Sequence, residues 1–433
     1  MSPAPLESLG RAAQAAIYRS GALGSRPEVP VSPARLERAA RRRMSRRAWA
    51  YVAGSAGQER TAQANLEAFA RFRIVPRMLR DVAARDLRVD LFGQTLPAPY
   101  LLAPIGVLEM AHRDADLAVA RAARELGLPM VLSTQASVPM ERVARELGDA
   151  PRWFQLYWSS NDDLVASLVS RAETIGSTAI VVTLDTHVLG WRARDLDLGF
   201  LPFAHGQGIA QYTSDPVFGE LVAKRAARPL TEPTPRPTPA ALRTLASITR
   251  HYPGRFADNL RSPLPRAAVE TFLDVFSRSS LTWRDLAFLR ERTRLPILLK
   301  GIQDPRDAEL ALDHGVDGIV VSNHGGRQVD NAVGALDALP DVLARVDGRV
   351  PVLFDSGIRS GADAFVALAL GARAVCVGRP YVYGLALAGT AGVVEVMRNM
   401  VAELDLTMAL AGCTSTAEIN ADLLRPVSAG AGV

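Results

Sequence analysis

The 433-residue chain has very little cysteine and almost no lysine. Its two cysteines, Cys376 and Cys413, are too few for a disulfide framework and lack the spacing of a metal site, so we expect no metal and a reducing, cytoplasmic location. Lys224 and Lys300 are the only lysines among 50 basic residues, and the rest are arginine. A lysine in so arginine-rich a chain suggests a role that a guanidinium does not fill.

Long apolar runs and a strong charge of one sign are also missing. No uninterrupted apolar run approaches the roughly 18 residues of a membrane span, so we expect no membrane partner. The net charge of +5 is small for this length and the charges are interspersed, which argues against a nucleic-acid partner. Hydrophobic residues make up 48% of the chain and charged residues 22%, a composition that favours a globular protein with a sizeable core.

The first 30 residues are rich in Ala, Pro, Gly and Ser and have weak periodicity, which predicts a loosely packed arm. Ser32 and Pro33 then form a typical helix start, a cap residue followed by proline. Arginines recur at helical spacing along residues 35–47. Because large apolar residues are missing opposite them, a solvated basic face is favoured over a helix that binds a membrane surface.

From residue 99 onward, short apolar runs alternate with helical patterns. Eight runs are apolar nearly throughout, as expected for parallel strands buried on both faces: Tyr100–Ala103, Met130–Ser133, Trp153–Trp158, Ala179–Asp185, Pro296–Gly301, Gly318–Asn323, Val350–Asp355 and Ala374–Gly378. The helical patterns are Asp114–Leu126, Val138–Leu147, Asp162–Ile175, Pro305–His314, Leu336–Val346 and Ala362–Leu370. This order predicts an α/β protein with a closed (β/α)8 TIM barrel. The expected division is an N-terminal arm with helices and a barrel-bottom segment at 1–98, and the barrel at 99–433.

One gap interrupts this order, because residues 186–295 separate the fourth run from the fifth. Loops of this length are usually functional lids or linkers, and a loop after a barrel strand emerges at the catalytic face. We therefore expect a lid insertion at about 190–290. Its Pro/Thr-rich centre at 231–239 predicts mobility, and a final helix near Trp283–Glu291 would restore the barrel.

Polar residues follow the predicted strands, and in a barrel these strand ends converge on one mouth. His324 lies among turn residues after the sixth run and can accept a proton near neutral pH. Asp185, at the end of the fourth run, could orient this imidazole or could simply cap the next loop. Arg327 could hold a substrate carboxylate as a bidentate fork. An isolated histidine would more often satisfy a loop carbonyl, but these neighbours favour a catalytic base.

Lys300 ends the fifth run and has three interpretations. It could form a Schiff base with a carbonyl substrate, it could be a structural lysine that reaches solvent, or it could be a fixed cation facing negative charge on a cofactor. The last two runs end in Gly357 and Gly378, which permit close backbone approach, and each is followed by an arginine, Arg359 or Arg379. On adjacent final strands this pattern favours a phosphate-bearing ligand.

The segment Ser322-Asn323-His324-Gly325-Gly326-Arg327-Gln328 resembles the active-site signature of the FMN-dependent α-hydroxy-acid oxidising enzymes, the family of glycolate oxidase and lactate oxidase. The resemblance extends from about Tyr51 to Gly389, interrupted by the long loop. Within the family, the segments 189–197 and 378–386 and the long fourth loop are most similar to lactate 2-monooxygenase.

The resemblance implies an FMN cofactor and a role for each matching residue. The catalytic and substrate-binding set would be His324 as the base, Asp185 as its partner, Arg192 and Arg327 on the substrate carboxylate, and Tyr51 and Tyr157 lining the pocket. The flavin ring and ribityl chain would contact Ala103, Pro104, Ile105, Ser133, Gln155, Thr183 and Ser322, with Lys300 beside the N1 and O2 edge. The ribityl chain and phosphate would contact Asp355, Ser356, Gly357, Arg359, Gly378 and Arg379.

Two departures from the glycolate oxidase pattern put glycolate in doubt as the substrate. Gly106 replaces an alanine near the reactive flavin edge, which would leave more space there, and Thr134-Gln135 replaces an aromatic wall after Ser133. Both are compatible with a lactate-type enzyme.

The expected function is oxidation of L-lactate with O2 to acetate, CO2 and water, with the long loop retaining the keto acid. The proton would come either from the hydroxyl, with hydride transfer, or from the α-carbon, through a carbanion. The alternatives are an oxidase or dehydrogenase that releases the keto acid and, from another class, a phosphate-binding lyase using Lys300 as a Schiff base. A barrel without catalysis is disfavoured by the polar strand ends. The family implies a homotetramer or larger.

Overall fold

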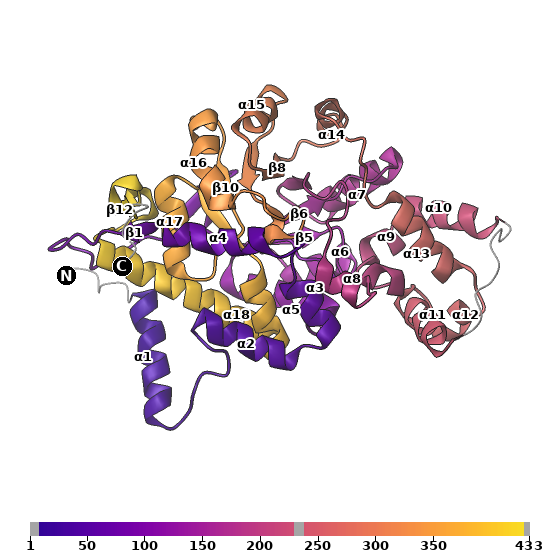
Figure 1. The fold of residues 1–433 in the computed structure, drawn as a ribbon, viewed down its shortest axis with the longest axis horizontal. Coiled ribbons are helices and arrows are strands. Elements are labelled where there is room, and N and C mark those ends of the chain that lie inside the picture. Colours follow the sequence, from indigo (N-terminus) through magenta and orange to yellow (C-terminus); the bar gives the residue numbers. More distant parts are fainter. Residues whose placement is uncertain (1–7, 229–237, 428–433) are drawn as a thin grey trace.

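A closed barrel of eight parallel strands forms the centre of the computed structural model, which describes residues 8–228 and 238–427 (Figure 1). The strands, in order around the barrel, are β4 (Tyr100–Leu102), β5 (Met130–Ser133), β6 (Arg152–Leu156), β7 (Ile180–Thr183), β8 (Ile297–Ile302), β9 (Gly318–Val321), β10 (Val352–Phe354) and β11 (Ala374–Val377). The ring closes where β11 pairs with β4. All eight strands fall on the predicted runs, so the (β/α)8 barrel is confirmed.

Eight helices surround the barrel: α5 (Ala115–Leu126), α6 (Met140–Leu147), α7 (Asp162–Thr174), α14 (Leu286–Arg290), α15 (Pro305–Asp313), α16 (Ala335–Val346), α17 (Gly361–Leu370) and α18 (Arg379–Ala411). Local sequence sets their ends. The Asn161 side chain accepts a hydrogen bond from the Leu164 backbone and caps α7, while Asp304 caps α15 ahead of Pro305. Gly127 ends α5 with a φ of 65°, a conformation that favours glycine.

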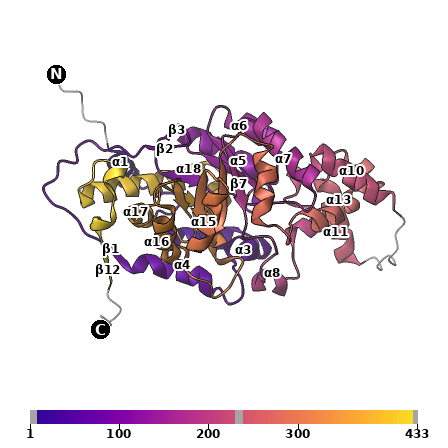
Figure 2. The same ribbon diagram turned by 90° about the horizontal axis from the view of Figure 1, so that it is seen from above.

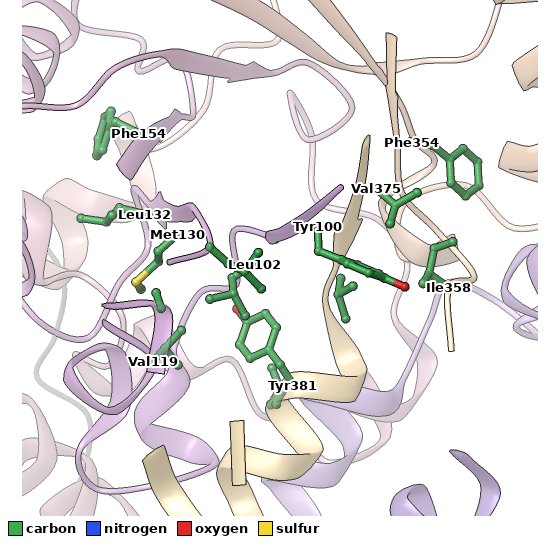
Figure 3. Close-up of a cluster of buried hydrophobic side chains, with 14 of the residues drawn as sticks. Tyr100, Leu102, Val119, Met130, Leu132, Phe154, Phe354, Ile358, Val375 and Tyr381 are labelled. Carbon is green, nitrogen blue, oxygen red and sulfur yellow. The ribbon is translucent and has the colours of Figure 1, made fainter. Parts of the chain in front are cut away.

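Both faces of the strands are buried, which explains their nearly continuous apolar sequence. Side chains on the outer face pack against the helices, and Figure 3 shows Met130 of β5 beside Val119 of α5. Side chains on the inner face, such as Trp153 and Leu298, form a second cluster inside the barrel.

A hairpin of β2 (Val89–Leu91) and β3 (Gln94–Leu96) contributes Val89, Leu91 and Leu96 to the apolar cluster inside the barrel. It therefore closes the end of the barrel opposite the strand carboxyl ends. At another edge, β1 (Phe72–Ile74) pairs antiparallel with β12 (Leu424–Pro426), which follows the short turns η5 (Thr416–Glu418) and η6 (Ala421–Leu423). The division of the chain at residue 98 stays a prediction.

The N-terminal segment contains helices, and residues 9–22 form a helix that the weak periodicity did not predict, although Gly10 is its one buried residue. Helix α1 (Leu9–Ala22) begins at the cap Ser8 and packs against α18, where Asp405 Oδ2 accepts a hydrogen bond from the Gly10 backbone at 2.8 Å. A buried ion pair joins Arg85 Nε to Asp405 Oδ1 at 2.6 Å. The sequence pattern missed this helix because its partners lie nearly 400 positions away along the chain. Residues 1–7 lie outside the described residues.

Three more helices precede the barrel: α2 (Pro33–Arg43), α3 (Arg46–Ala53) and α4 (Arg60–Ala70). Leu36 and Ala40 of α2 are buried, and α2 packs against α18, while its arginines are exposed. The arginine row is therefore a solvated face, as expected. One helix of the described residues, α18, is long and apolar enough to cross a membrane, but 56% of its apolar window is buried within the protein.

The long insertion is a helical extension at the end of the molecule farthest from α17 (Figures 1 and 2). Its first helix, α8 (Ala193–Asp197), packs against α3 near the barrel, and the extension then comprises η2 (Pro202–His205), α9 (Ala210–Thr213), α10 (Pro216–Ala226), α11 (Pro239–His251), α12 (Phe256–Leu260) and α13 (Leu264–Val275). Phe203, Tyr212, Phe218 and Phe272 form its buried aromatic centre. The expected helix near Trp283–Glu291 is confirmed as η3 (Trp283–Asp285) followed by α14. The expected mobile centre falls mainly on residues 229–237, outside the described residues.

Candidate active site

A ring of polar side chains lies at the carboxyl ends of the barrel strands. Successive strand residues point to opposite faces, so the residue two positions after an inward apolar residue also points inward. Gln155 follows Trp153 in this way, Thr183 follows Val181, and Lys300 follows Leu298. The remaining ring positions are Ser133, Ser322, Asp355 and Gly378. The barrel interior thus changes from an apolar core to a polar floor within one layer of side chains.

A cavity opens at this end of the barrel. The predicted residues that line it are Tyr51, Ala103, Pro104, Ile105, Tyr157, Arg192, Lys300, His324, Arg327, Asp355, Ser356, Gly357, Arg359, Gly378 and Arg379. Five others do not line it: Ser133, Gln155, Thr183, Ser322 and Asp185. These five are buried or part-buried close to lining residues, so the predicted set gathers at one site, while the individual roles stay predictions.

His324 and Asp185 form a close pair, with 2.7 Å between Nδ1 and Oδ1. Burial lowers the pKa of His324, although the carboxylate of Asp185 opposes this. Burial would raise the pKa of Asp185, but the charges of His324 and Lys300 outweigh it and lower that pKa to about 2. The imidazole is therefore neutral at pH 7, with Nδ1 held by a carboxylate and Nε2 left as its other ring nitrogen.

The backbone around His324 is strained and held by hydroxyl groups. His324 has a φ of 58°, an uncommon conformation for a residue with a side chain, within the short turn η4 (His324–Gly326). Ser322 Oγ accepts a hydrogen bond from the His324 backbone at 3.0 Å, and Ser356 Oγ accepts one from Gly325 at 2.9 Å. Ser356 in turn donates to Asp355. Thus two residues expected to bind the cofactor also position the histidine loop.

Two arginines, Arg192 and Arg327, line the same cavity. Arg327 Nη1 donates to the carbonyls of Tyr51 and Gly54, and its guanidinium carbon lies 5.1 Å from the Tyr51 ring centre. Arg192 is 7% exposed, and burial together with the nearby Arg327 lowers its pKa to about 10. Two cations in a partly buried cavity favour an anionic ligand between them, such as a carboxylate.

Lys300 is buried in an ion pair on the cavity floor. Its Nζ lies 3.1 Å from Asp355 Oδ2 and donates to Ser322 Oγ at 2.9 Å. Burial alone would lower the pKa of Lys300, but the carboxylates of Asp355 and Asp185 outweigh it and raise that pKa above its usual value. The amine therefore remains an ammonium, which is a poor nucleophile but a fixed positive charge beneath the cavity.

Comparison with known proteins identifies the family. A family model described as FMN-dependent dehydrogenase matches residues 40–426. The chain belongs to this family. Its relatives include an FMN-dependent alpha-hydroxy acid dehydrogenase, qulF, of Penicillium citrinum, 40% identical over 96% of each chain. An L-lactate oxidase of Lysinibacillus sphaericus is 42% identical over 89% of this chain and 90% of that protein.

Solved structures agree with this assignment. A crystal structure of mandelate oxidase with (S)-4-hydroxymandelic acid has a TM-score of 0.75 and 36% identity, and the match covers 92% of this chain and 98% of that one. The resemblance to FMN-dependent α-hydroxy-acid oxidising enzymes is thus confirmed, and FMN is the cofactor of this flavoprotein. The closer likeness to lactate 2-monooxygenase stays a prediction.

Buried polar atoms that lack hydrogen-bond partners in the protein are consistent with FMN binding at this site. Gln155 Nε2 and Thr183 Oγ1 are buried and have no hydrogen-bond partner among the described residues, although both belong to the polar ring. Gln155 Oε1 is already used, because it accepts from Ser133 Oγ and the Thr134 backbone. Buried donors without partners are costly, so these two call for a polar ring system above the floor, such as the flavin.

The two arginines expected to bind the phosphate differ in how many of their hydrogen-bond donors are already used by the protein. The only hydrogen bond of the Arg359 guanidinium to a described residue goes to the carbonyl of Ile358, so most of its donors are available to a ligand. Arg379 donates to the carbonyls of Val52, Gly54 and Gly325, and burial lowers its pKa to about 10. Arg379 therefore joins the rim loops, and a phosphate contact would have to be added to those bonds or replace some of them.

Of two glutamines near the site, Gln135 was expected in the pocket wall, whereas no role was predicted for Gln328. Gln135 lines the cavity, and a Cβ atom at Gly106 would lie 3.0 Å from the Gln135 Cβ. The room expected above Gly106 is therefore bounded by Gln135, and the two departures form one packing arrangement. Gln328 does not line the cavity but joins Arg192 to the Asp185 loop. Its signal was its place directly after Arg327 in the motif.

Proposed function

We propose that the protein oxidises L-lactate, or an L-2-hydroxy acid of similar size, with FMN and O2. The observation that carries this proposal is the convergence of His324 with Arg192 and Arg327 in one cavity above the buried ammonium of Lys300. A 2-hydroxy acid has a carboxylate for the two guanidiniums and a hydroxyl or α-carbon proton for the base.

The charge state of each residue determines its role in the proposed reaction. Arg192 and Arg327 bind and orient the substrate carboxylate, and Tyr51 and Tyr157 border the same space. Burial raises the pKa of Tyr157 to about 12, so its phenol stays protonated and able to donate a hydrogen bond. His324 accepts the substrate proton at Nε2, because its Nδ1 is engaged by Asp185, which then stabilises the imidazolium.

FMN, when bound, accepts two electrons from the substrate and passes them to O2. The contribution of this chain is the electrostatic setting: Lys300 places a fixed positive charge on the cavity floor, and Gln155 and Thr183 place free donors beside it. If the keto acid stays bound, lactate and O2 yield acetate, CO2 and water, which is the lactate 2-monooxygenase reaction that we propose. The loop Thr186–Arg192, which lines the cavity at the start of the insertion, supports retention.

An oxidase that releases pyruvate and hydrogen peroxide is the second candidate, favoured by the L-lactate oxidases among the relatives. One experiment separates the two. The purified holoenzyme should lose its yellow flavin absorbance when L-lactate is added without air. After air is admitted, one CO2 and no peroxide per lactate would support the monooxygenase, and one peroxide per lactate would establish the oxidase. No bleaching by any L-2-hydroxy acid would refute both.

The Schiff-base lyase is disfavoured by the ion pair that keeps Lys300 charged. Trapping of a carbonyl substrate by borohydride would be needed to support it. We further propose a cytoplasmic protein, since both cysteines are free, that assembles into a homotetramer or larger. Light scattering should then give at least four times the 46.5 kDa of one chain.

A further inference from the structure

We propose that Gln328 is a positioning residue that fixes the substrate-binding guanidinium of Arg192 relative to the His324–Asp185 pair. The proposal rests on the 2-hydroxy-acid reaction above, and it assigns the side chain a role in that reaction without contact to the cavity. Gln328 does not line the cavity, whereas Arg192, His324 and Arg327 all do.

Every polar group of the Gln328 side chain is used between two loops. Its Nε2 donates to the carbonyl oxygens of Asp185 at 2.6 Å and Val188 at 3.0 Å. Its Oε1 accepts a hydrogen bond from Arg192 Nη2 at 2.9 Å. One amide therefore holds the start of the loop after β7 and the arginine seven residues further along it.

The surrounding backbone reinforces this contact. A Cβ atom at Gly190 would collide with the carbonyl oxygens of Arg327 and Gln328, so the bare glycine lets the two loops lie against each other. Arg192 Nε also lies 3.4 Å from the Arg327 carbonyl. The loop that carries Arg192 is thus attached to the segment that carries His324 at several points, with the Gln328 amide in the centre.

Only an amide of this length satisfies all three partners. A glutamate would present a carboxylate to two carbonyl oxygens and would pair with Arg192, which would reduce the attraction of that guanidinium for a substrate carboxylate. A methionine has a similar length but neither donates nor accepts well, so it would leave the Arg192 guanidinium and the loop without this support. These two replacements separate charge from position.

The test uses Gln328→Met and Gln328→Glu holoenzymes, with Gln303→Met as the matched control. Gln303 is another half-buried glutamine, directly after β8, and its Nε2 donates to the Val333 carbonyl at 3.1 Å. Oxalate is the probe of the carboxylate site, followed by the change in the flavin spectrum. The KM for L-lactate and the anaerobic rate of flavin reduction are measured beside it.

We expect Gln328→Met to weaken oxalate binding and raise the KM by about tenfold to a hundredfold, the range for losing a hydrogen bond to a charged group. Gln328→Glu keeps the shape and should weaken oxalate binding further. FMN content and thermal midpoint should match the Gln303→Met control, whose oxalate affinity should equal that of the unmodified protein. Unchanged oxalate affinity in Gln328→Met and Gln328→Glu would overturn the proposal.

A double-variant cycle with Arg192→Met tests the route of the effect. If Gln328 acts through Arg192, adding Gln328→Met to Arg192→Met should cost little more oxalate affinity, whereas fully additive losses would refute that route. Failure of the proposed function would give a different result from failure of the Gln328 proposal. In that case the unmodified holoenzyme is not reduced by any 2-hydroxy acid, yet the difference in oxalate binding between the variants remains.

Discussion

The floor and the mouth of the cavity are built in different ways. The floor residues Gln155 and Lys300 lie in strands, are 1% and 5% exposed, and are placed by the register of the barrel. The mouth residues Arg192, His324 and Arg327 lie in loops and are placed by hydrogen bonds within and between those loops. A rigid floor suits a cofactor that stays bound, while loops can admit and release a small substrate.

The substitution His324→Ala should have the largest effect, because it should slow the reaction at the mouth without affecting FMN binding at the floor. Removing the proton acceptor should slow anaerobic flavin reduction by L-lactate about 10²–10⁴-fold, the usual contribution of general base catalysis. The FMN content should stay unchanged, because the floor keeps all its donors. Stopped-flow absorbance measures the rate, and a variant that is reduced at the normal rate would show that His324 is not the base.

Gln155→Leu tests the floor with a smaller effect. The leucine removes the unpaired Nε2 donor, so FMN affinity should fall about tenfold, as for the loss of one hydrogen bond, while the KM for L-lactate should stay the same. Titration of the apoprotein with FMN, followed by quenching of flavin fluorescence, measures this. The exposed Gln63→Leu serves as the control. A raised KM with unchanged FMN affinity would mean that floor and mouth are not separate.

The floor was more predictable from the sequence than the mouth. Continuous apolar runs marked the strands, and the family resemblance assigned Gln155, Thr183 and Lys300 at their ends to the cofactor site. No comparable rule exists for loops. The bonds of Gln328 to Asp185 and Val188 join positions about 140 apart, and those of Arg379 to Val52 and Gly54 join positions more than 300 apart.

Local patterns also failed where packing decides the structure. Helix α1 lacks a clear apolar stripe and is stabilised by Asp405 and Arg85, which no neighbouring residue signals. The insertion was expected to be a lid, yet among its described residues those that line the cavity lie within 186–192, and the helices that follow surround their own aromatic centre. Whether that part retains the keto acid is what the CO2 measurement tests.

The smallest expected effect is a shift in the pH dependence of kcat/KM in the Thr186→Val variant. The base works as the neutral imidazole, so kcat/KM falls as the pH drops through the pKa of His324, and burial places that fall below the usual 6.5. Thr186 Oγ1 donates to Asp185 Oδ1 at 3.0 Å and so lowers the pKa of Asp185. Without this donor the carboxylate should stabilise the imidazolium more strongly, raise the pKa of His324 and move the acid limb upward by less than about one pH unit. A shift toward lower pH would show that Thr186 stabilises the protonated histidine instead.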